Sequence, residues 1–491
     1  MSAEHLSSLD TRGRFFNYAN NPITIAGAVL AALTALMLLT VVAIHMMGGH
    51  LGPYSGIMAF MILPGVFVGG LVVVPLGIVL RRRRLLTQHV SEEEMNRFPK
   101  LDFNDSHLRK GALIFLVLTM GNAVIFATST YLGVEFMESP RFCGTVCHTV
   151  MSPEYTAYQN SPHSRVMCVQ CHIGPGASWF VKSKVDGLRQ VVATTLNTFS
   201  RPIHTPIENL RPAIQTCEQC HWPSKHHGDK LHSFVRFAED EENSPSYNAV
   251  LIKTGGGDLD SGRHGGIHWW HIYSDNKIRY LPGDERRLTI KWVELTNSAG
   301  EVRTYMRGGD EPPSAAELQE ARTFDCIDCH NRPTHLFQLP NKAIDEVMER
   351  RMEYAKLPYF KRQAMKAITG EYPTRDEGIE AVRAAMKDFY RNEYPEVAAE
   401  RSALVAAAAD AMADEVYAKI SFPEMNTNWD THPNHIGHPD INTDEGFLGC
   451  WRCHDDELST ADGKHAIPQD CDNCHTFLLE DSPTPPEFAQ E

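Results

Sequence analysis

Three long apolar runs stand near the N-terminus of an otherwise polar chain. Residues 24–46, about 55–80 and about 111–133 contain no Asp, Glu, Lys or Arg. A helix needs about 20 residues to cross a hydrocarbon core of roughly 30 Å, and each run is long enough. Buried helices of a soluble domain would rarely be charge-free three times in succession. We therefore predict three transmembrane helices within 24–133.

Basic residues distinguish the two sides of these helices. The link 81–110 carries eight Lys or Arg residues and begins with Arg81–Arg84, whereas the link 49–54 carries none. Basic residues favour the cytoplasmic side of a membrane. We therefore predict that the tail 1–23 and the loop 81–110 are cytoplasmic. Residues 134–491 then lie in the periplasm of a bacterial inner-membrane, multi-pass protein, and no cleaved signal peptide is expected.

Two patterned segments follow in the predicted periplasmic region. Within 232–315, residues 287–296 alternate apolar and polar positions and are followed by a turn and a returning strand, and 266–273 reads as a further strand. Residues 341–420 have helical periodicity. We expect a mixed fold, largely helix and loop outside the membrane, with a β-rich insertion. The tail 481–491 is expected to be disordered.

The charge of the chain is concentrated in the periplasmic region. Residues 1–133 hold 10 of the 46 basic and 7 of the 61 acidic residues, which leaves 36 and 54 for the remainder, a net charge of −18. An acidic surface repels phosphate backbones, so a nucleic-acid partner is excluded. The mean hydropathy of −0.29 also fits a mostly polar protein whose membrane part is confined to one region.

All 12 cysteines lie in the predicted periplasmic region, and they form six pairs that are each followed by histidine. Five pairs have the spacing C-x-x-C-H, and the first is longer by one residue. The motifs are Cys143/Cys147/His148, Cys168/Cys171/His172, Cys217/Cys220/His221, Cys326/Cys329/His330, Cys450/Cys453/His454 and Cys471/Cys474/His475.

This spacing is the signature of covalent haem attachment, in which two thiols bind one haem and the next histidine binds its iron. A disulfide framework would not explain a histidine after every pair. Zinc ribbons do not need that histidine, and a thioredoxin-like dithiol would be a single pair. We therefore predict six haems c, in a trihaem core at 134–231 and a second trihaem region at 316–480.

Thirteen further histidines could supply the second axial ligands of these haems. The leading distal candidates are His163, His268, His335 and His438. His264 and His271 compete with His268, and His432 and His435 compete with His438. Any of them could instead be a solvated surface histidine.

The segment FCGTVCHTVMSPEYTAYQNSPHSRVMCVQCH, with RPAIQTCEQCHWP after it, resembles the NapC/NirT family of membrane-bound quinol dehydrogenases over roughly 111–225. The long form is similar to the ImcH-type inner-membrane cytochromes of metal-reducing bacteria. Short family members have one membrane helix and four haems, so this chain departs from them. The resemblance implies electron transfer from the membrane quinol pool, menaquinol above all, to periplasmic c-type cytochromes or a reductase.

The resemblance also implies roles for particular residues. Met151, three residues after His148, is a possible ligand of the first haem iron, where the family has a Met two residues after its motif. Lys182, Lys184 and Asp186 lie in the stretch that forms the family's quinol site. A solvated helix face is the alternative reading of that stretch.

The predicted function is therefore quinol oxidation and electron transfer through six haems, in anaerobic respiration or extracellular electron transfer. Two alternatives stay open. The chain could be an electron-wiring subunit of a larger respiratory complex, or a terminal reductase of a small oxyanion such as nitrite. Multihaem nitrite reductases mark their open haem with Lys in place of the motif His, and no C-x-x-C-K occurs here.

Overall fold

The computed structural model describes residues 18–19, 21–46, 62–86, 104–146, 148–174, 176–207, 211–222, 228–256, 265–272, 276–438 and 449–486. The chain divides into two units, Met1–Val146 and Cys147–Glu491. Within the described ranges some helical side chains are also left out, among them those of His148, Phe180 and Val181. Most of the predicted tail 1–23, much of the loop 81–110, the last residues 487–491, Cys147, His226, His227 and His264 lie outside the described residues.

The first unit is helical, with α2 (Pro22–Met46), α4 (Leu63–Leu86), α6 (Ser106–Glu138) and α7 (Pro140–Thr145). Two described stretches are long and apolar enough to cross a membrane, Pro22–Val41 and Leu63–Arg84. The structure thus supports two of the three predicted spans. The third prediction, 111–133, falls inside the continuous helix α6, many of whose side chains lie outside the described part.

Helices α2 and α4 pack through small residues. A Cβ added at Gly27 would lie 2.9 Å from the carbonyl oxygen of Gly70. Just before α2 begins, the Asn21 side chain donates to the Gly77 carbonyl of α4 at 3.2 Å. Small residues allow such close backbone approach, which is how helices associate in lipid. Arg81–Arg84, predicted to begin a loop, belong instead to the last turns of α4. Positively charged side chains at the C-terminal end of a helix interact favourably with the helix dipole.

The second unit begins with α8 (His148–Gln159), α9 (Cys168–His172), α10 (Ala177–Thr195) and the single turns η3 (Ala213–Gln215) and η4 (Cys217–Gln219). The strands of the insertion are β1 (Lys230–Phe237), β2 (Pro245–Ile252), β3 (Lys277–Pro282), β4 (Ile290–Thr296) and β5 (Val302–Arg307). They are followed by α12 (Ala315–Glu320), β6 (Arg322–Thr323) and α13 (Cys326–Cys329). Short elements near the C-terminus are β7 (Ser421–Phe422), η8 (Pro423–Met425), β8 (Thr427–Asn428), η9 (Gly449–Arg452), β9 (Leu458–Ser459), η10 (Cys471–Asn473) and β10 (His475–Ser482).

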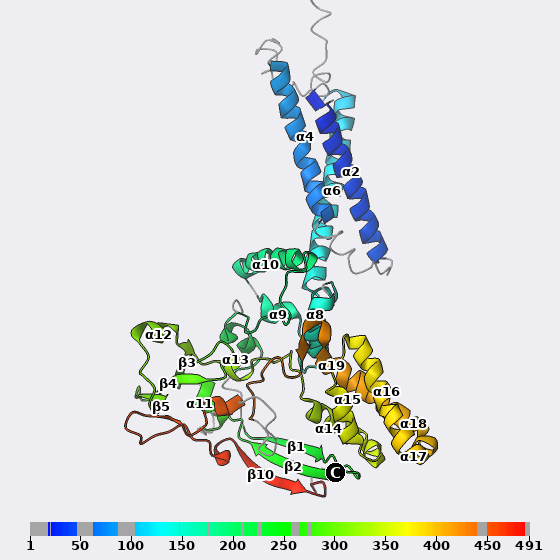
Figure 1. The fold of residues 1–491 in the computed structure, drawn as a ribbon. Coiled ribbons are helices and arrows are strands. Elements are labelled where there is room, and N and C mark those ends of the chain that lie inside the picture. The colour runs from blue at the N-terminus through cyan, green and yellow to red at the C-terminus, as the bar shows by residue number, and fades with distance from the viewer. Residues whose placement is uncertain are drawn as a thin grey trace, which may run out of the picture. The chain divides into compact units, whose positions relative to one another are not determined.

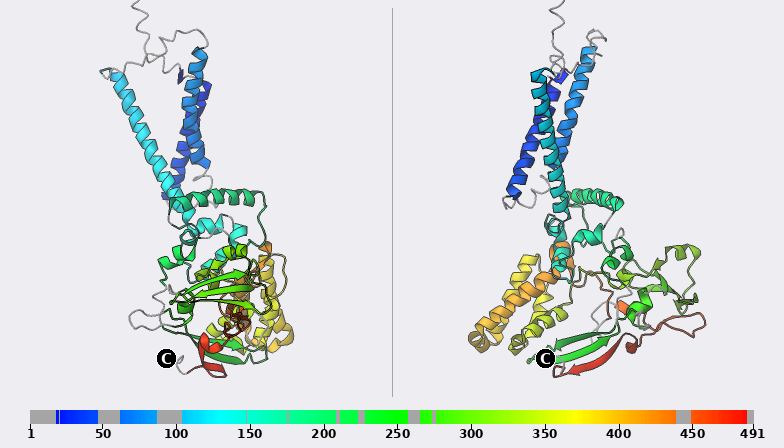
Figure 2. Two further views of the ribbon diagram at one scale, coloured as in Figure 1. Left: turned by 90° about the vertical axis from the view of Figure 1, so that its left-hand side faces the viewer. Right: turned by 180° about the vertical axis from the view of Figure 1, so that it is seen from behind.

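Two sheets join the insertion to the C-terminal region (Figures 1 and 2). One has the order β1-β2-β10 and the other β6-β3-β4-β5-β9. The predicted hairpin is present, since β4 pairs with β5 in antiparallel register. Because β10 and β9 come from beyond residue 450, the insertion is not an independent lobe. Asp481 and Ser482, predicted to be disordered, belong to β10.

The stretch 266–273, predicted as a strand, forms the helix α11 (Ile267–Ile272) instead. Gly265 and Gly266 before it have positive φ angles of 152° and 93°, which turn the chain away from the strand direction. The amides of Ile267 and Trp269 then donate to the carbonyls of Lys253 and Gly255. The strand prediction was wrong because alternation over a few residues does not exclude a short helix.

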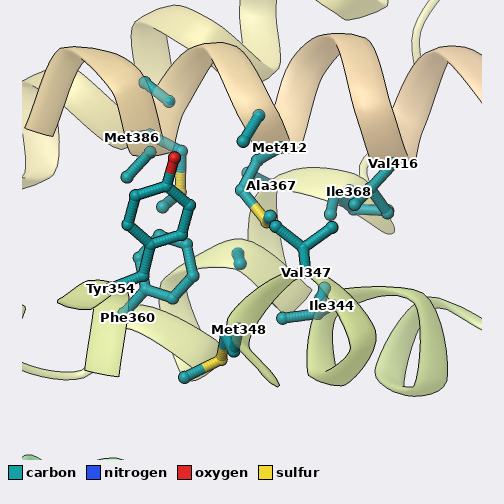
Figure 3. Packing of buried hydrophobic residues seen from close by; sticks show 14 of the residues in the cluster. Ile344, Val347, Met348, Tyr354, Phe360, Ala367, Ile368, Met386, Met412 and Val416 are labelled. Carbon is teal, nitrogen blue, oxygen red and sulfur yellow. The ribbon is translucent and has the colours of Figure 1, made fainter. Parts of the chain in front are cut away.

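Residues 340–420 form a helical bundle with its own core. Its elements are α14 (Pro340–Arg350), η6 (Met352–Lys356), α15 (Phe360–Ile368), α16 (Arg375–Glu393), α17 (Pro395–Glu400), α18 (Ser402–Asp410), η7 (Ala411–Tyr417) and α19 (Ala418–Ile420). Val382, Met386 and Tyr390 recur every four residues along α16, and all three are fully buried. Figure 3 shows Met386 and Met412 above the side chains of α14 and α15. No haem motif lies in this bundle.

Candidate haem and quinol sites

Each described cysteine pair lies on a short helical turn. The second motif coincides with α9, and the others contribute to α13, η4, η9 and η10. In three motifs the amide of the following histidine continues the turn, since His221, His330 and His454 donate to the carbonyl of the first cysteine at 2.8, 2.8 and 3.1 Å. Residues three apart share one side of such a turn. Both thiols can therefore face one ligand, with the histidine directly after them.

Two of the most buried cysteines lack the character of redox-active or metal-bound thiolates. Burial raises the pKa of Cys329 to about 12 and that of Cys453 to about 11. A reactive thiol needs a lowered pKa. No disulfide joins the eleven cysteines that the structure describes. Within the same residues no cluster of three His, Cys, Asp or Glu side chains could hold a metal ion.

Five motif histidines face a second imidazole within the second unit. The ring centroids are 6.2 Å apart for His172 and His335, 6.0 Å for His221 and His163, 6.4 Å for His330 and His268, 5.8 Å for His454 and His271, and 6.2 Å for His475 and His438. An imidazole nitrogen binds a metal at about 2.0 Å, so two imidazoles across one iron have ring centres roughly 6 Å apart. All five separations fit that arrangement.

Hydrogen bonds orient several of these rings. The Nδ1 atoms of His335, His268, His271 and His454 lie 2.5–3.0 Å from the carbonyl oxygens of Glu154, Thr254, Ile267 and Pro468. A carbonyl oxygen can only accept, so Nδ1 carries the proton and Nε2 keeps its lone pair. Metal-binding histidines are fixed in the same way.

Charge supports the same reading of the paired rings. Burial lowers the pKa of His271 to about 4, and burial also lowers the pKa of His268 and His335. These imidazoles are therefore neutral at pH 7, which is the form that binds a metal. His335 also touches the Glu154 carboxylate, which forms an ion pair with Arg332 at 3.1 Å.

The structure sorts the distal candidates. His163, His268, His335 and His438 each lie opposite a motif histidine. So does His271, which the sequence offered only as a competitor of His268. His432 and His435 are buried, and their Nε2 atoms have no hydrogen-bond partner, but no described motif histidine has a ring contact with them. The spacing of His268 and His271, three residues apart, would have pointed to His271 had the segment been predicted as a helix.

Cysteines of successive motifs lie close to each other. Cys171 lies within electrostatic range of Cys220. A hydrogen bond joins Cys217 to Cys326, raising the pKa of Cys217 and lowering that of Cys326. Cys450 interacts with Cys329 on one side and with Cys474 on the other. The second to sixth motifs therefore follow one another in space in chain order.

The three predicted quinol-site residues lie on α10. Lys182 and Asp186 are one helical turn apart and share a face, whereas Lys184 lies on another side of the helix. Lys182 Nζ is 5.2 Å from the centroid of the Trp179 ring. Val185, Leu188 and Val192 are at least half exposed and form an apolar row along the helix. Met151, the predicted ligand of the first iron, is half-buried on α8, one turn after His148.

Comparison with known proteins gives two matches. Residues 105–230 match the model of the NapC/NirT cytochrome c family, N-terminal region. The chain is also 39% identical over 475 residues to the cytochrome c-type protein ImcH of Geobacter sulfurreducens, across 96% of this chain and 90% of that protein. The chain belongs to the NapC/NirT family. No solved structure matches it.

Membership of the NapC/NirT family makes the chain a membrane-anchored multihaem cytochrome c that acts in electron transport. The family region 105–230 contains the first three motifs and α10, so the histidine pairs of the last three motifs lie beyond it. The paired rings, the Nδ1 anchors and the helical cysteine turns fit covalent haem, and they do not fit a disulfide framework or a zinc cluster.

Proposed function

We propose that this protein oxidises quinol at the periplasmic face of the bacterial inner membrane and passes the electrons through six haems c to periplasmic acceptors, such as c-type cytochromes or a reductase. The observation that carries the proposal is the set of five imidazole pairs, each spaced for one iron. Menaquinol is the expected substrate, in anaerobic respiration or extracellular electron transfer.

The cysteines and histidines would divide the work of holding the haems. The twelve motif cysteines would attach six haems, and the histidines of the second to sixth motifs would bind their irons. His335, His163, His268, His271 and His438 would supply the second ligand of the second to sixth irons, in that order. Each bound haem supplies one-electron transfer between ferric and ferrous iron. Because two imidazoles leave no open iron position, these five sites suit electron transfer and not reduction of an oxyanion.

The first haem is proposed to be the entry point. Cys143 lies on α7, directly after α6. We assign α6 as the third membrane helix, because 111–133 is charge-free and the helix is 33 residues long. Arg81–Arg84 at the end of α4 would stay cytoplasmic, which gives residues 134–491 a periplasmic position. His148 or Met151 would bind the first iron on its motif side.

Helix α10 would hold the quinol site. Its apolar row of Val185, Leu188 and Val192 suits the membrane surface, and Lys184 beside that row suits anionic headgroups. On the adjoining face, Lys182 can bind a quinol oxygen and Asp186 can accept a proton. Oxidation of one quinol releases two electrons and two protons. The haems would take up the two electrons one at a time, and Asp186 would pass the protons to the periplasmic water.

Rapid-mixing kinetics with a menaquinol analogue test the proposal. General-base help is worth roughly 10²–10⁴ in rate, so Asp186→Asn should slow quinol-driven haem reduction at least about tenfold. Reduction by dithionite and the haem content should stay normal. Asp462→Asn, in an exposed loop of the C-terminal region, is the matched control and should react as the wild type does.

Two results would contradict this assignment. Unchanged kinetics in both Asp186→Asn and the Lys182→Ala/Lys184→Ala double variant would put the quinol site elsewhere. A wild-type protein that dithionite reduces but no quinol analogue reduces would instead be an electron-wiring subunit.

A further inference from the structure

Helix α11 carries two histidines that face two different haem motifs. His268 and His271 are three residues apart and therefore lie on one side of the helix. The His268 ring faces His330 at 6.4 Å, and the His271 ring faces His454 at 5.8 Å. We propose that α11 is a ligand bridge, in which one helical turn supplies the distal ligands of two successive haems. The proposal rests on the haem attachment proposed above.

The rings on α11 are oriented for this role. The Nδ1 atom of His268 donates to the Thr254 carbonyl at 2.5 Å, and that of His271 donates to the carbonyl of Ile267 at 2.7 Å. Both leave Nε2 as the ligand nitrogen. One acceptor, Thr254, lies two residues after β2, and the other belongs to α11 itself. The two rings are thus held by acceptors in different segments.

The two motifs that α11 serves are in direct contact. Arg452, between Cys450 and Cys453, donates to the carbonyl of Asp328, between Cys326 and Cys329, at 2.7 Å. This contact keeps the fourth and fifth motifs at a fixed separation. Ligands three residues apart on a helix are only about 5–6 Å apart at their Cβ atoms. The two haems must therefore lie beside each other on the electron path.

A close backbone contact fixes α11 in place. A Cβ added at Gly266 would lie 2.6 Å from the amide nitrogen and 2.7 Å from the carbonyl oxygen of Gly255, and the φ of Gly266 is 93°. Only glycine fits there without displacing the backbone. Two residues before Gly255, Lys253 donates through its amide to the carbonyl of Cys474 at 2.8 Å. A residue larger than glycine at 266 would move both histidines of α11 together.

Spin-state counting in the intact holoprotein tests the bridge. An iron that loses an imidazole becomes high-spin, which electron paramagnetic resonance quantifies against total haem. His268→Ala and His271→Ala should each convert one haem from low-spin to high-spin, and the double variant should convert two haems. Gly266→Ala should weaken both sites with every histidine retained. Gly308→Ala, where an added Cβ meets nothing within 4 Å, is the matched control and should convert none.

The assignment is overturned if His271→Ala leaves every haem low-spin, or if Gly266→Ala affects no haem or only one. His271→Met offers a second readout that does not depend on the Gly266 variant folding. It should raise the reduction potential of one haem, because a Met/His pair has a higher potential than two histidines. No shift in any potential also refutes the bridge. Failure of the haem attachment itself would be distinguishable, since intact mass would then lack haem at those motifs in the wild type.

Discussion

A buried ion pair holds the haem-free bundle to the sheet. Lys361 Nζ donates to both carboxylate oxygens of Asp345, at 2.7 and 2.8 Å, and the Phe237 amide donates to the same carboxylate. Both charged side chains are at least nine-tenths buried. Removing one partner of such a pair costs about 3–5 kcal/mol, because the other charge stays buried alone. We expect Asp345→Ala to destabilise the bundle by about that amount.

Circular dichroism of the detergent-solubilised protein can follow the melting of these helices. The double variant Asp345→Leu/Lys361→Met should recover most of the loss, since it leaves no lone charge. Asp388→Ala breaks an exposed pair with Arg391 and should cost less than about 1 kcal/mol. A loss for Asp345→Ala as small as that of Asp388→Ala would contradict the expectation.

The same carboxylate gives a pH dependence. Burial raises the pKa of Asp345 to about 6, whereas an unfolded Asp titrates near 3.9. The folded state therefore binds the proton on Asp345 more tightly than the unfolded state does. The stability that this proton binding contributes is fully present below about pH 4 and is lost as the pH rises through about 6. The melting temperature of the wild type should therefore fall as the pH rises from about 4 to about 6. In the double variant, which has no carboxylate at position 345, this fall should be absent.

At the level of single residues, the sequence predicted those features that a short contiguous motif determines. The cysteine turns and their histidines are set by contiguous residues, so spacing alone located them. His163 and His335 were proposed as distal ligands because they adjoin a motif, and each lies opposite a motif histidine. His271 was predicted only as a competitor of His268, in a segment expected to be a strand, where residues three apart lie on opposite faces. On a helix the two share a side, and each can serve its own iron.

Among elements, the crossing of α2 and α4 depends on glycine. A Cβ at Gly27 would meet the Gly70 carbonyl oxygen and a Val73 methyl, both at 2.9 Å. Overpacking of this kind costs about 1–3 kcal/mol, so Gly27→Val should force the two helices apart. Gly69→Val, in the same α4 helix but with nothing within 4 Å of its added Cβ, should leave the crossing intact.

Limited proteolysis of the detergent-solubilised protein measures this difference. Cleavage of an opened segment follows the population of its open form, so about 1 kcal/mol would raise the rate roughly fivefold. Equal rates for Gly27→Val and Gly69→Val would show that the crossing does not depend on the glycine contact. The hydrophobic runs predicted both helices, but apolar periodicity could not indicate which faces meet, because lipid and helix neighbours are equally apolar.

At the scale of the molecule, long-range strand pairing was the feature that the sequence did not reveal. Strand β10 pairs with β2, and β9 pairs with β5, although more than 100 residues separate the partners. Alternation of apolar residues predicts strands but not which distant strand completes a sheet. The consequence is functional. The insertion and the last haem motifs form one structure, so α11 is held where it can face the fourth and fifth motifs.

The order of the motifs in space leads to a last prediction. Cys326 contacts Cys217 of the third motif, and Cys329 lies beside Cys450 of the fifth, so among the described motifs the fourth haem would link the third to the fifth. Removing it with Cys326→Ala/Cys329→Ala should leave five haems by intact mass. Quinol should then rapidly reduce only the three on the entry side, while dithionite reduces all five. Removing the last haem with Cys471→Ala/Cys474→Ala is the matched control, because all five remaining haems should still be reduced quickly. Fast quinol reduction of all five haems in the first variant would mean that electrons bypass the fourth site.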